Sequence, residues 1–257
     1  MEKAKLSMSI ILVSIVTVFF LMVGYVYAAG SIEPTYPQSI TTESSGRWQT
    51  VGAKTIEAEA GNVTGLTIVD KRTTQAWQGY YGNITGTITL DDASNYTMYD
   101  WNIPTPTGEI YASNGSGVAW ADNIMCVDFT STTDALNETT LETFFGINAT
   151  DLDGFSETFN TTYTDATGFQ VGGIVINTGD SCHQTYTYVD EAYQTNSFKE
   201  VLLTDNQSIV FTALLENNVD GFKTGVDPND FQMLVAEDGH PGAEATTTTY
   251  WFYVELA

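Results

Sequence analysis

Residues 247–256, TTTYWFYVEL, decide the fold class that the sequence predicts. β-Branched and aromatic residues dominate this stretch, and such residues favour extended strands. Successive strand residues point to opposite faces, so the large side chains form two sets: Tyr250, Phe252, Val254 and Leu256 on one face, Trp251 and Tyr253 on the other. Both sets are apolar. We therefore expect burial on both sides, with a second copy of the protein as one candidate cover.

Further strand signals lie between segments rich in Gly, Asn and Asp. Residues 85–90 (TGTITL) alternate along the chain, residues 173–176 (GIVI) form a short apolar run, and residues 208–215 (SIVFTALL) are β-branched and apolar. Asn114-Gly115 has the composition of a tight hairpin turn. The sequence predicts an all-β fold, an antiparallel β-sandwich-like domain spanning residues 47–257.

One segment, residues 132–146, has a helical pattern instead. Its apolar residues fall near helical spacing, with Asp134 as a candidate N-cap and Gly146 as a stop. We expect one short helix laid across the β-rich domain.

The first 29 residues predict export. Lys3 and Lys5 precede an uncharged, mostly apolar run, which is long enough for a removable signal peptide or for a retained membrane anchor helix. Lys3-Ala4-Lys5 also permits archaeal pilin-type processing, in which the apolar helix is kept as an assembly core. Residues 30–46 contain two prolines and many hydroxyls, and we interpret them as a flexible tether. The expected location is extracellular, at the cell surface.

The exported part is acidic because basic residues are scarce in it. After residue 29 there are 6 basic residues against 31 acidic ones, a net charge of −25. Binding to nucleic acids or anionic lipids relies on clusters of Lys and Arg, so these partners are excluded, and membrane contact is expected only through the N-terminal segment. A surface of Thr, Asn, Ser, Gly and Tyr suits glycans, divalent cations or neighbouring subunits.

The two cysteines, Cys126 and Cys182, both lie in the exported part, where a thiol pair normally oxidises. We expect a disulfide, whose stabilisation is about 4 kcal/mol in the loop-entropy model. Two buried free thiols are the alternative.

Eight Asn-x-Ser/Thr sequons are present, and in an exported protein they predict glycosylation at some sites. Chance occurrence in a chain rich in Asn and Thr is the alternative. The candidate sites are Asn62, Asn83, Asn95, Asn114, Asn137, Asn148, Asn160 and Asn206.

A partial match to a calcium loop begins at Glu216. Glu216, Asn218, Asp220 and Asp227 supply oxygen ligands at positions 1, 3, 5 and 12, and a glycine occupies position 6. The flanking segments resemble strand and loop rather than helices. Solvated acidic turns are the alternative, as they are for a second cluster that contains Asp151, Asp153 and Glu157.

Aromatic residues favour a binding surface over a catalytic one. Trp77, Tyr80 and Tyr81 lie beside glycines, and sugar rings stack on such side chains, although core packing is the more common role of aromatics. Only His183 and His240 are available for nucleophilic or zinc chemistry, and no family signature of an enzyme occurs. We therefore expect no catalytic residues, without excluding a secreted hydrolase.

A short pattern occurs twice. GNVTG at residues 61–65 recurs as GNITG at residues 82–86, and each copy precedes a strand-like stretch that ends in Asp. Two adjacent strands entered by similar turns are the preferred interpretation, and a functional repeat is the alternative.

The segments WQGYYGNITGTITLDDA, YDW, GEIYAS and DFQM…YWFYVEL resemble a recurring pattern of uncharacterised exported archaeal cell-surface proteins. That family has no assigned chemistry, so the resemblance implies a location and no site residues. The expected function is a non-enzymatic, glycosylated structural or adhesive protein of the cell surface that assembles with itself or with other surface proteins. A carbohydrate-binding or calcium-dependent recognition module is the alternative.

Overall fold

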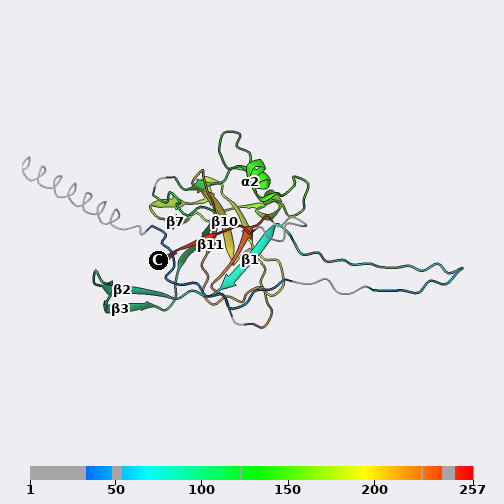
Figure 1. Cartoon of the computed structure of the whole chain (residues 1–257), viewed down its shortest axis with the longest axis horizontal. Helices are drawn as coiled ribbons and strands as arrows, with labels where there is room; N and C mark the ends of the chain where they lie inside the picture. The colour runs from blue at the N-terminus through cyan, green and yellow to red at the C-terminus, as the bar shows by residue number, and fades with distance from the viewer. Residues whose placement is uncertain (1–32, 48–53, 122, 227, 239–246, 257) are drawn as a thin grey trace, which may run out of the picture.

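The structure is a computed structural model, and it describes residues 33–47, 54–121, 123–226, 228–238 and 247–256 (Figure 1). The predicted signal or anchor helix at residues 1–29 lies outside this part. Within it, no helix is long and apolar enough to cross a membrane. The predicted all-β class is confirmed, with antiparallel strands throughout.

The strands are β1 (Trp77–Gly82), β2 (Gly86–Asp91), β3 (Thr97–Ile103), β4 (Gly108–Ser113), β5 (Met125–Cys126), β6 (Thr161–Thr162), β7 (Phe169–Val171), β8 (Ile174–Ile176), β9 (His183–Tyr186), β10 (Lys199–Thr204), β11 (Ile209–Leu214), β12 (Phe231–Ala236) and β13 (Trp251–Leu256). The helices are α2 (Glu138–Phe145), α3 (Phe155–Thr158) and the 3₁₀ turn η1 (Thr178–Asp180). The main sheet has seven strands in the order β13-β4-β11-β10-β9-β6, with β5 also paired to β10.

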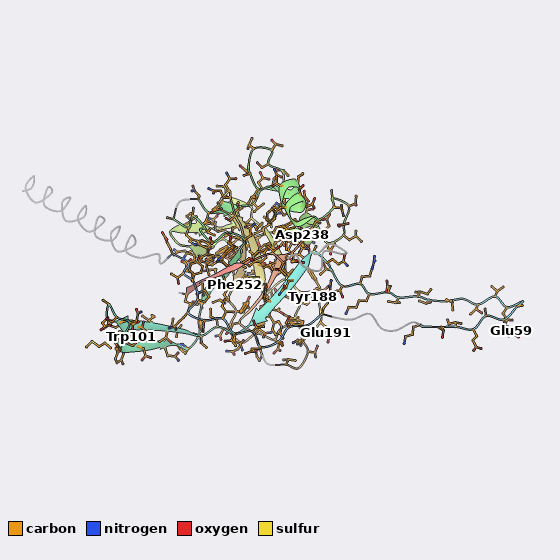
Figure 2. All side chains as sticks on the ribbon, in the orientation of Figure 1. Glu59, Trp101, Tyr188, Glu191, Asp238 and Phe252 are labelled. Atoms are coloured by element: carbon orange, nitrogen blue, oxygen red, sulfur yellow. A yellow bond between two sulfur atoms is a disulfide. The ribbon has the colours of Figure 1, made fainter. Side chains whose placement is uncertain are left out.

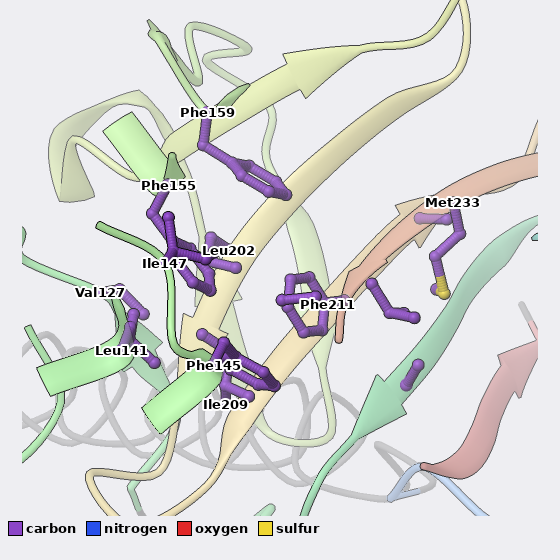
Figure 3. Close-up of a cluster of buried hydrophobic side chains, with 14 of the residues drawn as sticks. Val127, Leu141, Phe145, Ile147, Phe155, Phe159, Leu202, Ile209, Phe211 and Met233 are labelled. Carbon is purple, nitrogen blue, oxygen red and sulfur yellow. The ribbon is translucent and has the colours of Figure 1, made fainter. Parts of the chain in front are cut away.

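Alternate residues of the main sheet's strands point to opposite faces, and other parts of the chain pack on both faces. On one face Leu202 and Phe211 pack against the β1–β12 ribbon and the two short helices (Figure 3). On the other face Val201 and Val210 pack against the β7–β8 hairpin and the segment around Trp120. The result is a β-sandwich-like body with two apolar clusters separated by one sheet.

The predicted disulfide joins Cys126 to Cys182. Cys126 pairs with Leu203 of β10, and Cys182 immediately precedes β9, which pairs with the first half of β10. The bond therefore connects two short strands that lie end to end along the same edge of β10.

The closing strand β13 lies at one edge of the main sheet, paired with β4. Its two apolar sets face opposite clusters, as predicted, and this chain itself covers both. The free edge is partly covered as well, since Thr35 exchanges two backbone hydrogen bonds with Val254 and Tyr36 stacks on Tyr253. The first described residues of the expected tether are thus held against the sheet.

Two local predictions need correction. The helix α2 begins after Asn137, not at Asp134, because the Asn137 side chain accepts the Thr140 N–H and the Thr140 hydroxyl accepts the Asn137 N–H. Gly146 ends the helix in the left-handed conformation, as predicted, and α3 is an additional short helix. Asn114-Gly115 is not a hairpin turn. Asn114 Oδ1 accepts the Ile209 N–H at 3.0 Å and links the end of β4 to β11.

Two extensions leave the body in opposite directions (Figure 1). One is the β2–β3 hairpin, residues 86–103, which forms a two-stranded sheet. The other, which we call the arm, comprises residues 54–73. It has an extended backbone and turns back near Glu59, but contains no strand. The first copy of the GN(V/I)TG pattern lies in the arm and the second leads into β2, so the interpretation as two adjacent strands was wrong.

Candidate functional site

The β2–β3 hairpin has one apolar face and one polar face. Its register pairs Ile88 with Trp101 and Leu90 with Tyr99, so these four side chains share a face. All four are about half exposed, at 58%, 49%, 51% and 60% respectively. The opposite face is mostly polar and carries Thr87, Thr89, Asp100 and Asn102, together with Met98, which is 84% exposed beside the register shift.

No other described element pairs with this hairpin, so both of its outer edges are open. Trp101 lies well away from the body, and the rings of Tyr99 and Trp101 contact each other edge to face, with centroids 4.9 Å apart (Figure 2). A two-stranded hairpin is only marginally stable alone in water, and apolar faces of sheets are normally packed. The hairpin is thus the clearest candidate interaction surface among the described residues. Its alternation is readable from the sequence, but its exposure is not.

The three aromatics of the expected ligand-binding cluster do not share one exposed surface. Trp77 is partly buried and packs against the core, since its ring contacts Phe155 and Phe211 and its Nε1 donates to the Asp153 carbonyl at 2.6 Å. Tyr80 is half-buried against Phe252. Only Tyr81 is exposed, with the Lys223 ammonium 4.4 Å from its ring centroid.

Three of the four expected calcium ligands are described, and Asp227 lies outside the described residues. Glu216 is half-buried, and its Oε1 accepts the Phe198 N–H at 3.0 Å. Asn218 is exposed, and its amide donates to Asn217. Asp220 is exposed. Glu216 and Asp220 belong to no group of converging acidic, His or Cys side chains among the described residues, and the calcium loop stays a prediction.

A different acidic group forms where α2 meets α3. Carboxylate oxygens of Glu138, Glu142 and Glu157 lie within 4.8 Å of one another. Burial, followed by the charges of its acidic neighbours, raises the pKa of the buried Glu142. Of the second cluster named from the sequence only Glu157 belongs to this group, because Asp151 and Asp153 accept hydrogen bonds from Asn148 and Thr74. The spacing of Glu138 and Glu142 by one helical turn was the signal that the sequence offered.

All eight sequons lie within the described residues, and none of their asparagines is buried. Asn62, Asn148 and Asn160 use their side-chain amides as hydrogen-bond donors. The amides of the others donate no hydrogen bond within the described part; these are Asn83, Asn95, Asn114, Asn137 and Asn206. Attachment of a glycan to this group breaks no amide hydrogen bond of the fold.

One surface hollow combines aromatic rings with hydroxyl groups. Its volume is about 400 Å³, and it is lined by Phe144, Asp238, Trp251, Asn114 and the threonines at 247–249. Phe144 is exposed and Trp251 is half-buried. Rings beside hydroxyls and a carboxylate can stack on a sugar and bond its hydroxyls.

A carboxyl pair is buried at the edge of the main sheet. Glu109 and Glu255 are cross-strand partners on β4 and β13. Burial, and then the charge of Glu255, raises the pKa of Glu109 to about 8, and burial also raises the pKa of Glu255. Elsewhere Glu200 is fully buried, and burial raises its pKa well above the ordinary value. None of these three carboxyls lines the hollow between Phe144 and Trp251.

The catalytic alternatives gain no support from the described residues. Cys182 is in the disulfide, and the half-buried His183 stacks on Phe129 with ring centroids 4.0 Å apart. His240 lies outside the described residues. No protein-family model, curated protein or solved structure matches this chain.

Proposed function

We propose that the protein is a non-enzymatic, glycosylated structural protein of the cell surface, of the archaeal exported type, that assembles with copies of itself. The apolar face of the β2–β3 hairpin carries this proposal. Ile88, Leu90, Tyr99 and Trp101 together form an apolar strip that no described part of the chain covers. In an exported protein, burial of such a strip by another subunit is the simplest way to stabilise the hairpin.

The remaining features are compatible with this role. The apolar N-terminal run provides export, and the disulfide fits an oxidising exterior. Amides of exposed sequons such as Asn83 and Asn95 are accessible for glycans. A base-poor surface rich in Thr and Asn fits contact with other subunits better than contact with nucleic acid.

The intact protein, isolated from its native cell envelope, tests the proposal. Its mass reports processing, glycans and the disulfide together, and light scattering of the same sample reports its assembly state. We expect glycosylated, disulfide-bonded protein in species larger than a monomer. A monodisperse, unmodified monomer recovered only from the medium would overturn the proposal.

The hollow between Phe144 and Trp251 favours a second candidate, carbohydrate recognition. Its rings, the Asp238 carboxylate and the threonine hydroxyls are the chemical groups that bind sugars. A glycan array probed with the wild type and with Phe144→Ala tests this candidate, since Phe144 is exposed and its truncation leaves the core intact. Binding that Phe144→Ala abolishes supports it, and a blank array removes it.

A further inference from the structure

The arm is an extended chain without a sheet. Within the described part of the chain, the only backbone–backbone hydrogen bond that residues 54–70 make is the turn contact from the Asn62 N–H to the Glu59 carbonyl. Five large apolar side chains of the arm are more than half exposed, and four of them are β-branched: Ile56, Val63, Leu66, Ile68 and Val69. Such a segment has the composition of a strand and lacks only a pairing partner.

The returning half of the arm repeats the sequence of a segment that does form a strand. Residues 61–70 read GNVTGLTIVD, and residues 82–91, which lead into and include β2, read GNITGTITLD. β2 pairs with β3 through six residue pairs, from Gly86–Ile103 to Asp91–Thr97. Residues 61–70 therefore resemble β2 and the residues that lead into it, both in the GN(V/I)TG pattern and in their β-branched content. β2 covers one edge of β3, and the other edge of β3 is open.

The two extensions differ in charge. Residues 86–103 contain Asp91, Asp92 and Asp100 and no base. The arm contains Lys54, Lys71 and Arg72, half of the 6 bases after residue 29, and also Glu57, Glu59 and Asp70, so its net charge is zero. The acidic hairpin of another copy therefore repels the neutral arm less than it repels the acidic chain on average.

The partner has to be a second copy. The arm and the hairpin leave opposite sides of the body, so the arm of one copy does not reach its own hairpin (Figure 1). Contact between an arm and the hairpin of another copy is head-to-tail and leaves a free arm and a free hairpin at the two ends. Heterologous contacts of this kind form rings or open filaments.

We propose that residues 61–70 of one copy add as a third strand to the open edge of β3 in a second copy. This inference rests on the self-assembly proposed above and names its interface. Backbone pairing satisfies the open edge of the hairpin, as in other cases of strand addition. One of the two alternating apolar sets of the added strand, Val63 with Val69 or Leu66 with Ile68, then lies on the face of Tyr99 and Trp101, and three strands in place of two stabilise the hairpin.

Two variants of the full chain, studied in a mild detergent, separate the two sides of the contact. Trp101→Asp blocks the hairpin, and replacement of residues 55–70 by a short Gly-Ser linker removes the arm. Both changes affect exposed segments, so the body folds in each. Asn102→Asp, which adds the same charge on the polar face, is the matched control. Sedimentation velocity is measured for each variant alone and for their equimolar mixture.

We expect the wild type and Asn102→Asp to form large species and each blocked variant alone to remain monomeric. The mixture should yield a 1:1 dimer that grows no further, because one intact arm meets one intact hairpin. Thr67→Pro, which removes a backbone donor, should weaken association at least tenfold relative to Thr67→Ala. Assembly of the wild type with a monomeric mixture overturns this interface and leaves the proposed function standing. A wild type that remains monomeric overturns both.

Discussion

Ile88 of β2 and Trp101 of β3 are direct cross-strand partners whose side chains both face solvent from the same side of the hairpin. In the main sheet, by contrast, the apolar strand residues are covered. Phe211 packs against the β1–β12 ribbon, and Val210 packs against the β7–β8 hairpin. The same strand chemistry thus builds a covered sheet in the body and an uncovered one in the extension. This contrast is the basis for assigning the hairpin to an intermolecular contact.

The buried carboxyls predict a protein that is more stable in acid. The folded state raises the pKa of Glu109 from 4.5 to about 8, so Glu109 remains protonated at pH 7 in the folded protein and ionises on unfolding. The unfolded state then binds fewer protons, and stability falls as pH rises between about 4.5 and 8. Each such carboxyl changes the free energy of unfolding by about 1.4 kcal/mol per pH unit.

Urea denaturation from pH 4.5 to 8 measures this slope. Glu109→Gln, which keeps the side chain neutral at every pH, should make the slope shallower, while Glu200 maintains part of it in the same direction. A slope of opposite sign, or one that Glu109→Gln leaves unchanged, would show that the folded protein does not hold Glu109 protonated.

Loss of the disulfide should destabilise the body without changing its fold. The bond closes a separation of 56 residues, and its removal in Cys126→Ala/Cys182→Ala should lower the free energy of unfolding by about 4 kcal/mol. Chemical denaturation of the double variant beside the wild type measures the difference. Equal stability of the two proteins would contradict a structural role for the bond.

The aromatic residues near β1 should differ in their contribution to stability. Trp77→Ala removes a ring that packs on Phe155 and Phe211, and should cost about 3 kcal/mol. Tyr81→Ala removes an exposed ring and a contact with Lys223, and should cost less than about 1 kcal/mol. Thermal melts of both variants measure this ordering, and equal losses would contradict the packing of Trp77 against the core.

Glycan occupancy should follow exposure and hydrogen bonding of the sequon amides. Asn83 and Asn95 are exposed and their amides donate no hydrogen bond within the described residues, so they should be the most fully modified. The Asn148 amide donates a hydrogen bond to Asp151, and the Asn160 amide donates one to the Glu157 carbonyl, so these two sites should be modified less. Mass mapping of peptides from native protein measures site occupancy, and the reverse order would exclude this rule.

Local sequence patterns predicted much of the secondary structure. β11 and β13 follow from runs of β-branched and aromatic residues, and Gly146 marks the end of α2. The sequence does not identify the N-cap, because several side chains in residues 132–137 can cap a helix, Asp134 among them. The one that caps is Asn137, whose side chain bonds Thr140.

Long-range features were less accessible. Trp77 resembles a binding residue in sequence because flexible glycines surround it, and only the tertiary contact with Phe155 reveals that it packs against the core. The alternation of residues 85–90 correctly predicts β2, but a half-buried strand and an uncovered one have the same alternation. Whether an element covers Ile88 depends on the path of the whole chain, which no local pattern specifies.

Sedimentation velocity of the full chain over a range of concentrations tests the central claim, assembly through the hairpin, most directly. The wild type should show sedimentation coefficients that rise with concentration, more steeply at high salt because the net charge of −24 is then screened. Leu90→Asp should remain monomeric, while Thr89→Asp, which adds the same charge to the polar face, should assemble as the wild type does. Identical behaviour of Leu90→Asp and the wild type would contradict the account.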